Sequence, residues 1–131
     1  MLKILEPENF DAVYSLMEES FPPDEHRPYK AQKALLSNPL YRIYVLEKGE
    51  EIAAFMATWN LSDFLFLEHF AVKPAHRNQG LGGELLAELS KIEGKRICLE
   101  AEPPETPLAE RRIGFYLRCG FSQNTYPYHQ P

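Results

Sequence analysis

The junction between an apolar strand and a helix, near the middle of the chain, constrains the fold more than any other feature. Residues 64–72 read FLFLEHFAV, a run in which only Glu68 and His69 are polar. Because polar and apolar side chains do not alternate, the run predicts a strand that is covered on both faces and lies inside a sheet. Pro74 ends it, and residues 81–93 then place leucines at helical spacing. We therefore expect a sheet with helices packed against it.

Similar patterns run through the rest of the chain. We expect further strands at residues 2–5, 41–47, 52–59, 96–101 and 121–126, and further helices at residues 10–21, 29–36 and 108–119. The order is β-α-α-β-β-β-α-β-α-β, in a single domain that comprises residues 1–131. This order predicts an α/β fold with a mixed sheet and helices on both of its faces.

Composition and charge argue against several classes of protein. The chain carries 14 Lys and Arg against 19 Asp and Glu, a net charge of −5, whereas binding to nucleic acid needs a basic surface. No apolar run approaches the roughly 20 residues of a membrane span, and the N-terminus is too polar for a signal peptide. The two cysteines, Cys98 and Cys119, make no disulfide framework. We expect a cytoplasmic protein that contacts neither nucleic acid nor membrane and has no metal site.

The start of the helix at residues 81–93 is rich in glycine. Residues 77–83 read RNQGLGG. Glycine lets backbone N–H groups approach a ligand, the start of a helix is electropositive, and Arg77 adds a formal charge. This combination predicts a phosphate site. The alternative is a turn that only packs a helix onto a sheet, since the spacing matches neither the Rossmann nor the Walker pattern.

Two stretches carry a resemblance to a known family. Residues 77–82, RNQGLG, follow an Ala-Val-x-Pro strand end and resemble the R/Q-x-x-G-x-G/A signature of the GNAT superfamily, the GCN5-related N-acetyltransferases. Residues 111–121, RRIGFYLRCGF, resemble a later helix of that family. The resemblance implies a mixed, mostly antiparallel sheet with one more strand after that at residues 121–126, and residues 126–131 cannot supply it. A longer chain, a partner chain such as a second copy in a homodimer, or an open edge would account for the missing strand.

The resemblance also implies acetyl-CoA as co-substrate. The pyrophosphate would lie on a set of amides beside Arg77: those of Asn78, Gln79, Gly80, Leu81, Gly82 and Gly83. The pantetheine arm would add as an extra strand to a bulged central strand, at Phe70, Ala71 and Val72. Main-chain hydrogen bonds would then supply the affinity.

Transfer of an acetyl group to an amine needs a group that takes a proton from the amine. Glu68 is the first candidate, as base or as substrate anchor, because a carboxylate in an apolar strand needs a partner or a role. The alternative is a structural carboxylate that is paired with a neighbouring Arg or Lys. Strand alternation predicts that His69 points to the opposite face and packs there.

Glu100 and Tyr116 are the other catalytic candidates. Glu100 ends the next strand, where it would act through a water or as a counter-charge to an amine; the alternative is a carboxylate on the solvated rim. The family resemblance implies that Tyr116 is the acid that protonates the leaving thiolate; the alternative is a core aromatic. We expect an acetyl-CoA-dependent N-acetyltransferase that acts directly on an amine of a small molecule, peptide or protein. The alternative is a GNAT-like module that binds acyl-CoA with little catalysis.

The acceptor side is expected in the first two helices and the loop between them, at residues 21–36. Asp24 and Glu25 in this loop could attract a cationic amine, but a solvated loop is the favoured explanation for them. Trp59, at the end of a predicted strand, is a candidate for lining the acceptor pocket.

Overall fold

The structure is a computed structural model that describes residues 2–77, 80–99 and 107–118. Its contacts group the chain into two compact units, residues 1–100 and 101–131, and each is described by itself. The second unit contains helix α4 (Pro107–Arg118), which confirms the helix expected at residues 108–119 over its described part. The strand expected at residues 121–126 lies outside the described residues.

The strands of the first unit form one sheet in the order β1-β2-β3-β4-β5. They are β1 (Leu2–Ile4), β2 (Tyr41–Lys48), β3 (Glu51–Asn60), β4 (Phe64–Val72) and β5 (Arg96–Cys98). The neighbours pair antiparallel except β4 and β5, which run parallel. The expected mixed, mostly antiparallel sheet is therefore confirmed, with β4 inside it. The sharp turn of the β2–β3 hairpin uses Gly49 at φ 65°.

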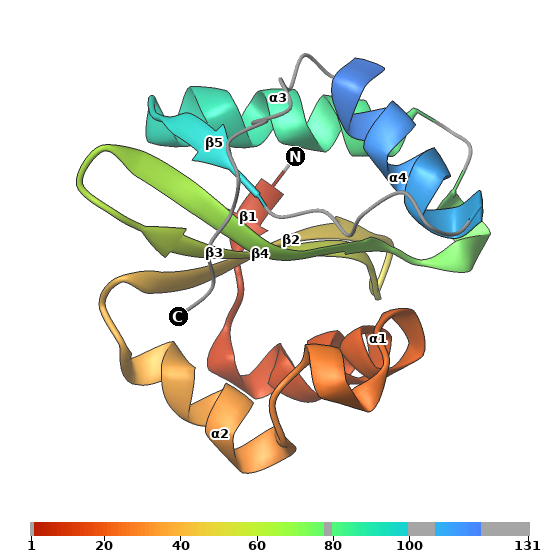
Figure 1. The fold of residues 1–131 in the computed structure, drawn as a ribbon. Coiled ribbons are helices and arrows are strands. Elements are labelled where there is room, and N and C mark those ends of the chain that lie inside the picture. The colour runs from red at the N-terminus through yellow and green to blue at the C-terminus, as the bar shows by residue number, and fades with distance from the viewer. Residues whose placement is uncertain (1, 78–79, 100–106, 119–131) are drawn as a thin grey trace. The chain divides into compact units, whose positions relative to one another are not determined.

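Three helices cover the two faces of this sheet (Figure 1). Helices α1 (Phe10–Ser20) and α2 (Tyr29–Ala34) lie on one face, and α3 (Leu81–Glu93) lies on the other. The start and end of α3 agree with the sequence pattern. Helix α2 is shorter than expected because residues Leu35–Ser37 tighten into a 3₁₀ turn. The helix-covered sheet confirms the predicted fold class.

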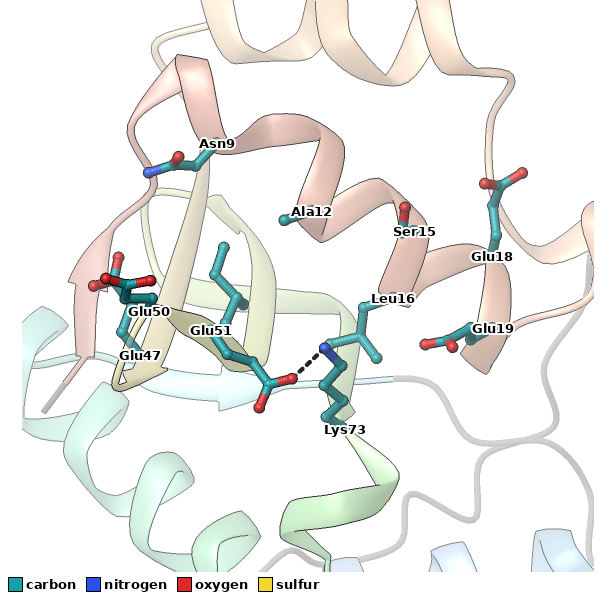
Figure 2. Close-up of a pocket in the computed structure, with 11 residues that line it drawn as sticks. Asn9, Ala12, Ser15, Leu16, Glu18, Glu19, Glu47, Glu50, Glu51 and Lys73 are labelled. Carbon is teal, nitrogen blue, oxygen red and sulfur yellow. Dashed lines mark hydrogen bonds and ion pairs between the residues drawn. The ribbon is translucent and has the colours of Figure 1, made fainter.

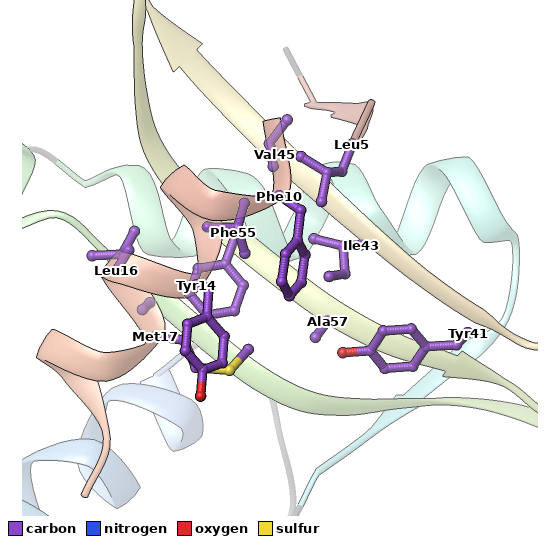
Figure 3. Close-up of a cluster of buried hydrophobic side chains, with 12 residues drawn as sticks. Leu5, Phe10, Tyr14, Leu16, Met17, Tyr41, Ile43, Val45, Phe55 and Ala57 are labelled. Carbon is purple, nitrogen blue, oxygen red and sulfur yellow. The ribbon is translucent and has the colours of Figure 1, made fainter. Parts of the chain in front are cut away.

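The core lies between α1 and the sheet (Figure 3). Phe10, Val13 and Met17 have i, i+3, i+7 spacing, so they share one face of α1, and all are at most 1% exposed. They pack with Ile43 of β2 and Phe55 of β3. Burial of each large side chain contributes about 1.5–3 kcal/mol, so this layer holds α1 firmly on the sheet.

Strand β4 contains a bulge at Glu68. Ala57 of β3 pairs with His69, but the next residue of β3, Thr58, pairs with Leu67. Glu68 is therefore an extra residue with no partner in β3. Bulges re-aim side chains and increase the local twist of the strand that carries them.

Strands β4 and β5 separate soon after they begin to pair. Their ladder runs from Phe64, opposite Arg96, to Phe66, opposite Cys98. β4 continues to Val72. Within the described residues, the edge of β4 beyond Phe66 that faces away from β3 pairs with no other strand. Among residues 2–77 and 80–99, the sheet is thus open on one side of the bulge.

Candidate active site

The open edge of β4 presents main-chain groups. The N–H of Lys73 donates to the carbonyl of Ala53 at 2.7 Å, which continues the β3–β4 register by one residue. Hydrogen-bonded pairs alternate in an antiparallel ladder, so Ala71 also faces β3, whereas the N–H and C=O groups of Phe70 and Val72 face the open edge. An extended ligand can form strand-like hydrogen bonds there.

The glycine-rich junction follows at the end of β4. Arg77 is exposed, and its Nε donates to the carbonyl of Val72 at 2.9 Å. Gly80 is the N-cap of α3, has φ 74°, and provides no side-chain cap. The first N–H groups of a helix have no partner within it, so α3 begins with amides that can bind an anion. The structure brings Arg77, Val72 and the start of α3 together; Asn78 and Gln79 lie outside the described residues.

Glu68 is held by two other side chains. Arg27 binds it with both arms of its guanidinium, Nη1 to Oε1 and Nη2 to Oε2, each at 2.9 Å, and the indole N–H of Trp59 donates to Oε1 at 3.3 Å. Burial alone would raise the pKa of this carboxyl. The hydrogen bonds and charge of Arg27, the indole N–H and the neighbouring His69 outweigh burial, and the pKa of Glu68 is lowered.

The prediction that His69 points away from Glu68 is wrong. His69 Nδ1 lies 3.8 Å from Glu68 Oε1, and His69 Nε2 is 2.7 Å from the carbonyl of Glu25. Glu25 and Arg27 belong to one loop, so Glu68 and His69 face the same side of the sheet. The physical reason is the bulge, because its extra residue breaks the strict alternation of side chains.

Arg27 is itself anchored on the α1–α2 side. Its carbonyl accepts a hydrogen bond from the Tyr14 hydroxyl at 2.9 Å, and its Nη1 lies 3.4 Å from Oε1 of Gln32. Gln32 is fully buried and binds the hydroxyl of Tyr41. The sequence predicted a structural pairing of Glu68 with a cation only as an alternative and did not identify Arg27. The available signal was the lone carboxylate in an apolar strand, which requires a partner.

The remaining catalytic candidates stay predictions. Tyr116 lies on α4, in the second unit, with its ring 5.3 Å from that of Phe115 in an edge-on contact. Glu100 lies outside the described residues. In the described part of the chain, no three His, Cys, Asp or Glu side chains gather to hold a metal ion. No helix of that part has the length and apolar character needed to cross a bilayer.

A separate cavity of about 690 Å³ lies between α1 and the β2–β3 hairpin (Figure 2). Most of its charged lining is acidic: Glu18, Glu19, Glu47, Glu50 and Glu51, with Lys73 as the cation. Glu51 binds Lys73 Nζ at 2.6 Å and His76 Nε2 at 3.0 Å, and these contacts lower the pKa of Glu51. Lys73 and His76 are thereby turned toward Glu51. None of the residues predicted for catalysis or cofactor binding lines this cavity.

Comparison with protein families gives one domain match. A family model described as "Acetyltransferase (GNAT) domain" matches residues 39–123, which include β4, the glycine-rich junction and α4. YjbC of Bacillus subtilis (strain 168), a candidate acetyltransferase by name, is 34% identical over 110 residues, which are 82% of this chain and 55% of YjbC. The chain thus spans little more than half the length of this relative.

Further similar proteins are also acetyltransferases by name or by family. Another protein of Bacillus subtilis, by name a candidate N-acetyltransferase for alanine of ribosomal protein bS18, is 30% identical over 120 residues, 86% of this chain and 74% of that protein. A solved GNAT-family structure from Bacteroides thetaiotaomicron has a TM-score of 0.85 and 30% identity, and the match covers all of this chain and 77% of that one. The aminoglycoside acetyltransferase AAC(6')-Iy, solved with a CoA-based bisubstrate analogue, has a TM-score of 0.76 at 15% identity, over all of this chain and 97% of that one. This last match concerns the fold alone.

Proposed function

Because this chain belongs to the GNAT acetyltransferase family, we propose that it is an N-acetyltransferase that uses acetyl-CoA and transfers the acetyl group directly to an amine. The observation that carries this proposal is the open edge of β4 at Phe70 and Val72, which leads through Arg77 to the start of α3, where the N-cap Gly80 has no capping side chain. The edge offers main-chain hydrogen bonds to the extended part of such a cofactor, and the start of α3 offers amides to its phosphates.

Acetyl-CoA would bind in two parts. Its pantetheine arm would pair with the main chain of Phe70, Ala71 and Val72, as an added strand. Its pyrophosphate would lie on the amides at the start of α3, where the helix dipole and Arg77 favour an anion. Strand addition depends on main-chain groups, so the affinity does not require particular side chains on β4. The CoA-based analogue bound to AAC(6')-Iy supports the choice of cofactor.

The reaction needs a proton to leave the amine and another to reach sulfur. An alkylammonium has a pKa of about 10.4, so the acceptor must lose a proton before its nitrogen attacks the thioester carbon. Glu68 or Glu100 would take that proton, directly or through a water. The tetrahedral intermediate then expels the CoA thiolate, and Tyr116 would protonate the sulfur. No acyl-enzyme forms, because the amine attacks acetyl-CoA itself.

The acceptor is an amine of a small molecule, peptide or protein. The named activities of the relatives support both kinds, since some act on aminoglycosides and one is named for a protein alanine. A net charge of −5 and only two cysteines favour a cytoplasmic enzyme that binds neither nucleic acid nor membrane. We also propose a homodimer, in which a second copy of the chain is a further partner.

Calorimetric titration of acetyl-CoA into the chain tests the cofactor site. Saturable binding should weaken about tenfold in Arg77→Ala, which is the loss of one charge-assisted contact of about 1.4 kcal/mol. Lys91→Ala is the matched control. It removes an exposed cation from the last turn of α3, at the opposite end from the proposed pyrophosphate site. Equal weakening in both variants, or no binding by the folded chain, would contradict the proposal.

A panel of amines, with detection of released thiol, then tests catalysis. Tyr116→Phe should bind acetyl-CoA as the unchanged chain does but turn over about 10²-fold more slowly, since general acid catalysis is lost. Unchanged turnover would remove Tyr116 from the acid role. Binding without turnover by any amine would favour the alternative, an acyl-CoA-binding module, for which the capture of Glu68 by Arg27 is the supporting observation.

A further inference from the structure

The loop between α1 and α2 is fastened to β4 at the bulge. The two consecutive residues Glu68 and His69 hold two loop residues that are also close in sequence. Arg27 binds Glu68, and the carbonyl of Glu25 accepts a hydrogen bond from Nε2 of His69, because a carbonyl oxygen can only accept. The bulge thus joins the loop of the expected acceptor side to the strand that carries the open edge.

We propose that Arg27 is a positioning residue for the acceptor side, whose guanidinium holds the Glu68 carboxylate ionised and in one orientation, so that Glu68 meets the incoming amine as an anion. This inference rests on the proposed function and adds a residue to it. Arg27 itself does not have to touch the acetyl group or the amine. Its effect is exerted through Glu68.

The hydrogen bonds on Glu68 leave room for one more donor. A carboxylate offers about four lone-pair positions. Oε1 accepts from Arg27 Nη1 and Trp59 Nε1, and Oε2 accepts from Arg27 Nη2. One position on Oε2 is not filled by the described contacts. The Glu68 side chain is 21% exposed, so the carboxylate is not sealed from small donors such as an ammonium group or a water.

A guanidinium is suited to this task because its geometry is a rigid fork. Two parallel hydrogen bonds fix the plane of a carboxylate, whereas a lysine ammonium acts as a point charge. The fork is itself fixed, because Tyr14 holds the carbonyl of Arg27 and Gln32 lies beside its Nη1. The orientation of Glu68 is therefore set by the loop that α1 and α2 anchor, together with Trp59 of β3.

The charged and titratable groups around Glu68 come from the loop between α1 and α2, from β4 itself and from β2. Arg27 faces it from the loop, His69 from the neighbouring position of β4, and Tyr41 from β2. Burial and the charge of Glu68 raise the pKa of Tyr41, so this phenol stays neutral at any working pH. Arg27 also remains charged at every such pH. Replacement of Arg27 by an uncharged residue is thus the substitution that most directly changes the pKa of Glu68.

Carbon-13 NMR of labelled glutamate carboxyls tests the inference without any need for activity. The signal of Glu68 is assigned by its loss in Glu68→Gln. In the unchanged chain Glu68 should titrate below the ordinary value of 4.5. In Arg27→Met its midpoint should rise by about 1–3 pH units, because the pairing is lost while burial remains. Lys48→Met, which removes an exposed cation from the end of β2, is the control and should leave the midpoint unchanged.

Kinetics provide the second readout. The ratio of kcat/KM in Arg27→Met to that of the unchanged chain, with one amine acceptor, should rise as the pH increases through the raised Glu68 midpoint found by NMR and then level off below one. Because both chains are measured with the same amine, the effect of pH on the ionisation of that amine cancels in the ratio. Arg27→Lys keeps the charge but not the fork, so its ratio should be flat with pH and below one. Lys48→Met should give a ratio near one throughout.

Two results would overturn the inference. One is a Glu68 midpoint that is the same with and without Arg27. The other is a kcat/KM for cationic amines that increases in Arg27→Met at every pH, which would mean that Arg27 occupies the place of the acceptor. Failure of the proposed function would be seen separately, as absence of acetyl-CoA binding or of turnover in the unchanged chain, and the NMR measurement would still decide the role of Arg27.

Discussion

Arg27 and Glu68, which are 41 residues apart in the sequence, are joined by two parallel hydrogen bonds of 2.9 Å. The pair connects the loop after α1 to the bulge of β4. Both side chains are largely withdrawn from water, with exposed fractions of 34% and 21%. The contact therefore has consequences for stability as well as for the chemistry proposed above.

Glu68→Gln should lower the free energy of unfolding by about 1–2 kcal/mol at pH 7, since it leaves Arg27 half-buried without its counter-charge. The pKa of Glu68 is lowered in the folded chain, so its contribution is fully present above the unfolded value, near 4.5. The contribution is lost as the pH falls through the lower, folded value. Urea unfolding of both chains at pH 7 and near pH 3.5 should show the difference shrinking at the lower pH. Glu50→Gln, on the exposed hairpin turn, is the control, and a pH-independent difference would contradict the argument.

Gly80→Ala and Gly94→Ala form a matched pair at the two ends of α3. Both glycines have positive φ, 74° and 63°, and a Cβ at either would meet nothing within 4 Å. Each alanine should therefore cost about 1–2 kcal/mol from backbone strain alone. Only Gly80→Ala should also weaken acetyl-CoA binding, because relief of the strain would move the first amides of α3. Denaturant unfolding and calorimetric titration separate the two effects, and an equal change of affinity in both variants would argue against a ligand at this turn.

The amides of Phe70 and Val72 should respond to acetyl-CoA more than those of His69 and Ala71. The latter pair face β3 in the ladder and are protected in the free chain, whereas the former face the open edge. With acetyl-CoA at 100 times its Kd, hydrogen exchange at Phe70 and Val72 should slow by about 100-fold if bound ligand alone protects them. Residue-resolved exchange measured by NMR would test this. Equal slowing across all four amides would indicate general stabilisation instead of strand addition.

The sequence was most informative where local patterns decide the structure. The leucines of α3 and the αL glycine at Gly94 define that helix, and the apolar run of β4 together with Pro74 defines that strand. The fold class followed from the order of such elements. The phosphate-binding prediction rested on glycines at a helix start, and Gly80 does take the positive φ that only glycine adopts readily.

The features that sequence did not predict are non-local. The family resemblance implied a bulged central strand, but the position of the bulge at Glu68 depends on how β3 and β4 pair. No residue at this point marks it, so the orientation of His69 was predicted wrongly. The pairing of Glu68 with Arg27 depends on where a loop after α1 meets the sheet. Such contacts are set by the packing of the whole first unit, which a pattern of nearby residues does not contain. The roles of Glu68, Glu100 and Tyr116 remain predictions.

The open edge of β4 also bears on how proteins of this design can change. A main-chain edge offers the same donors and acceptors whichever side chains the strand carries, and proline alone would remove an N–H from it. Phe70 and Val72, which are half-buried, can therefore be replaced by other residues suited to a strand while the hydrogen-bonding surface is retained. Mutations in the loop at Arg27 face no such constraint from the edge. If acetyl-CoA pairs with this edge as proposed above, related chains can keep one acetyl donor while their loops come to accept different amines.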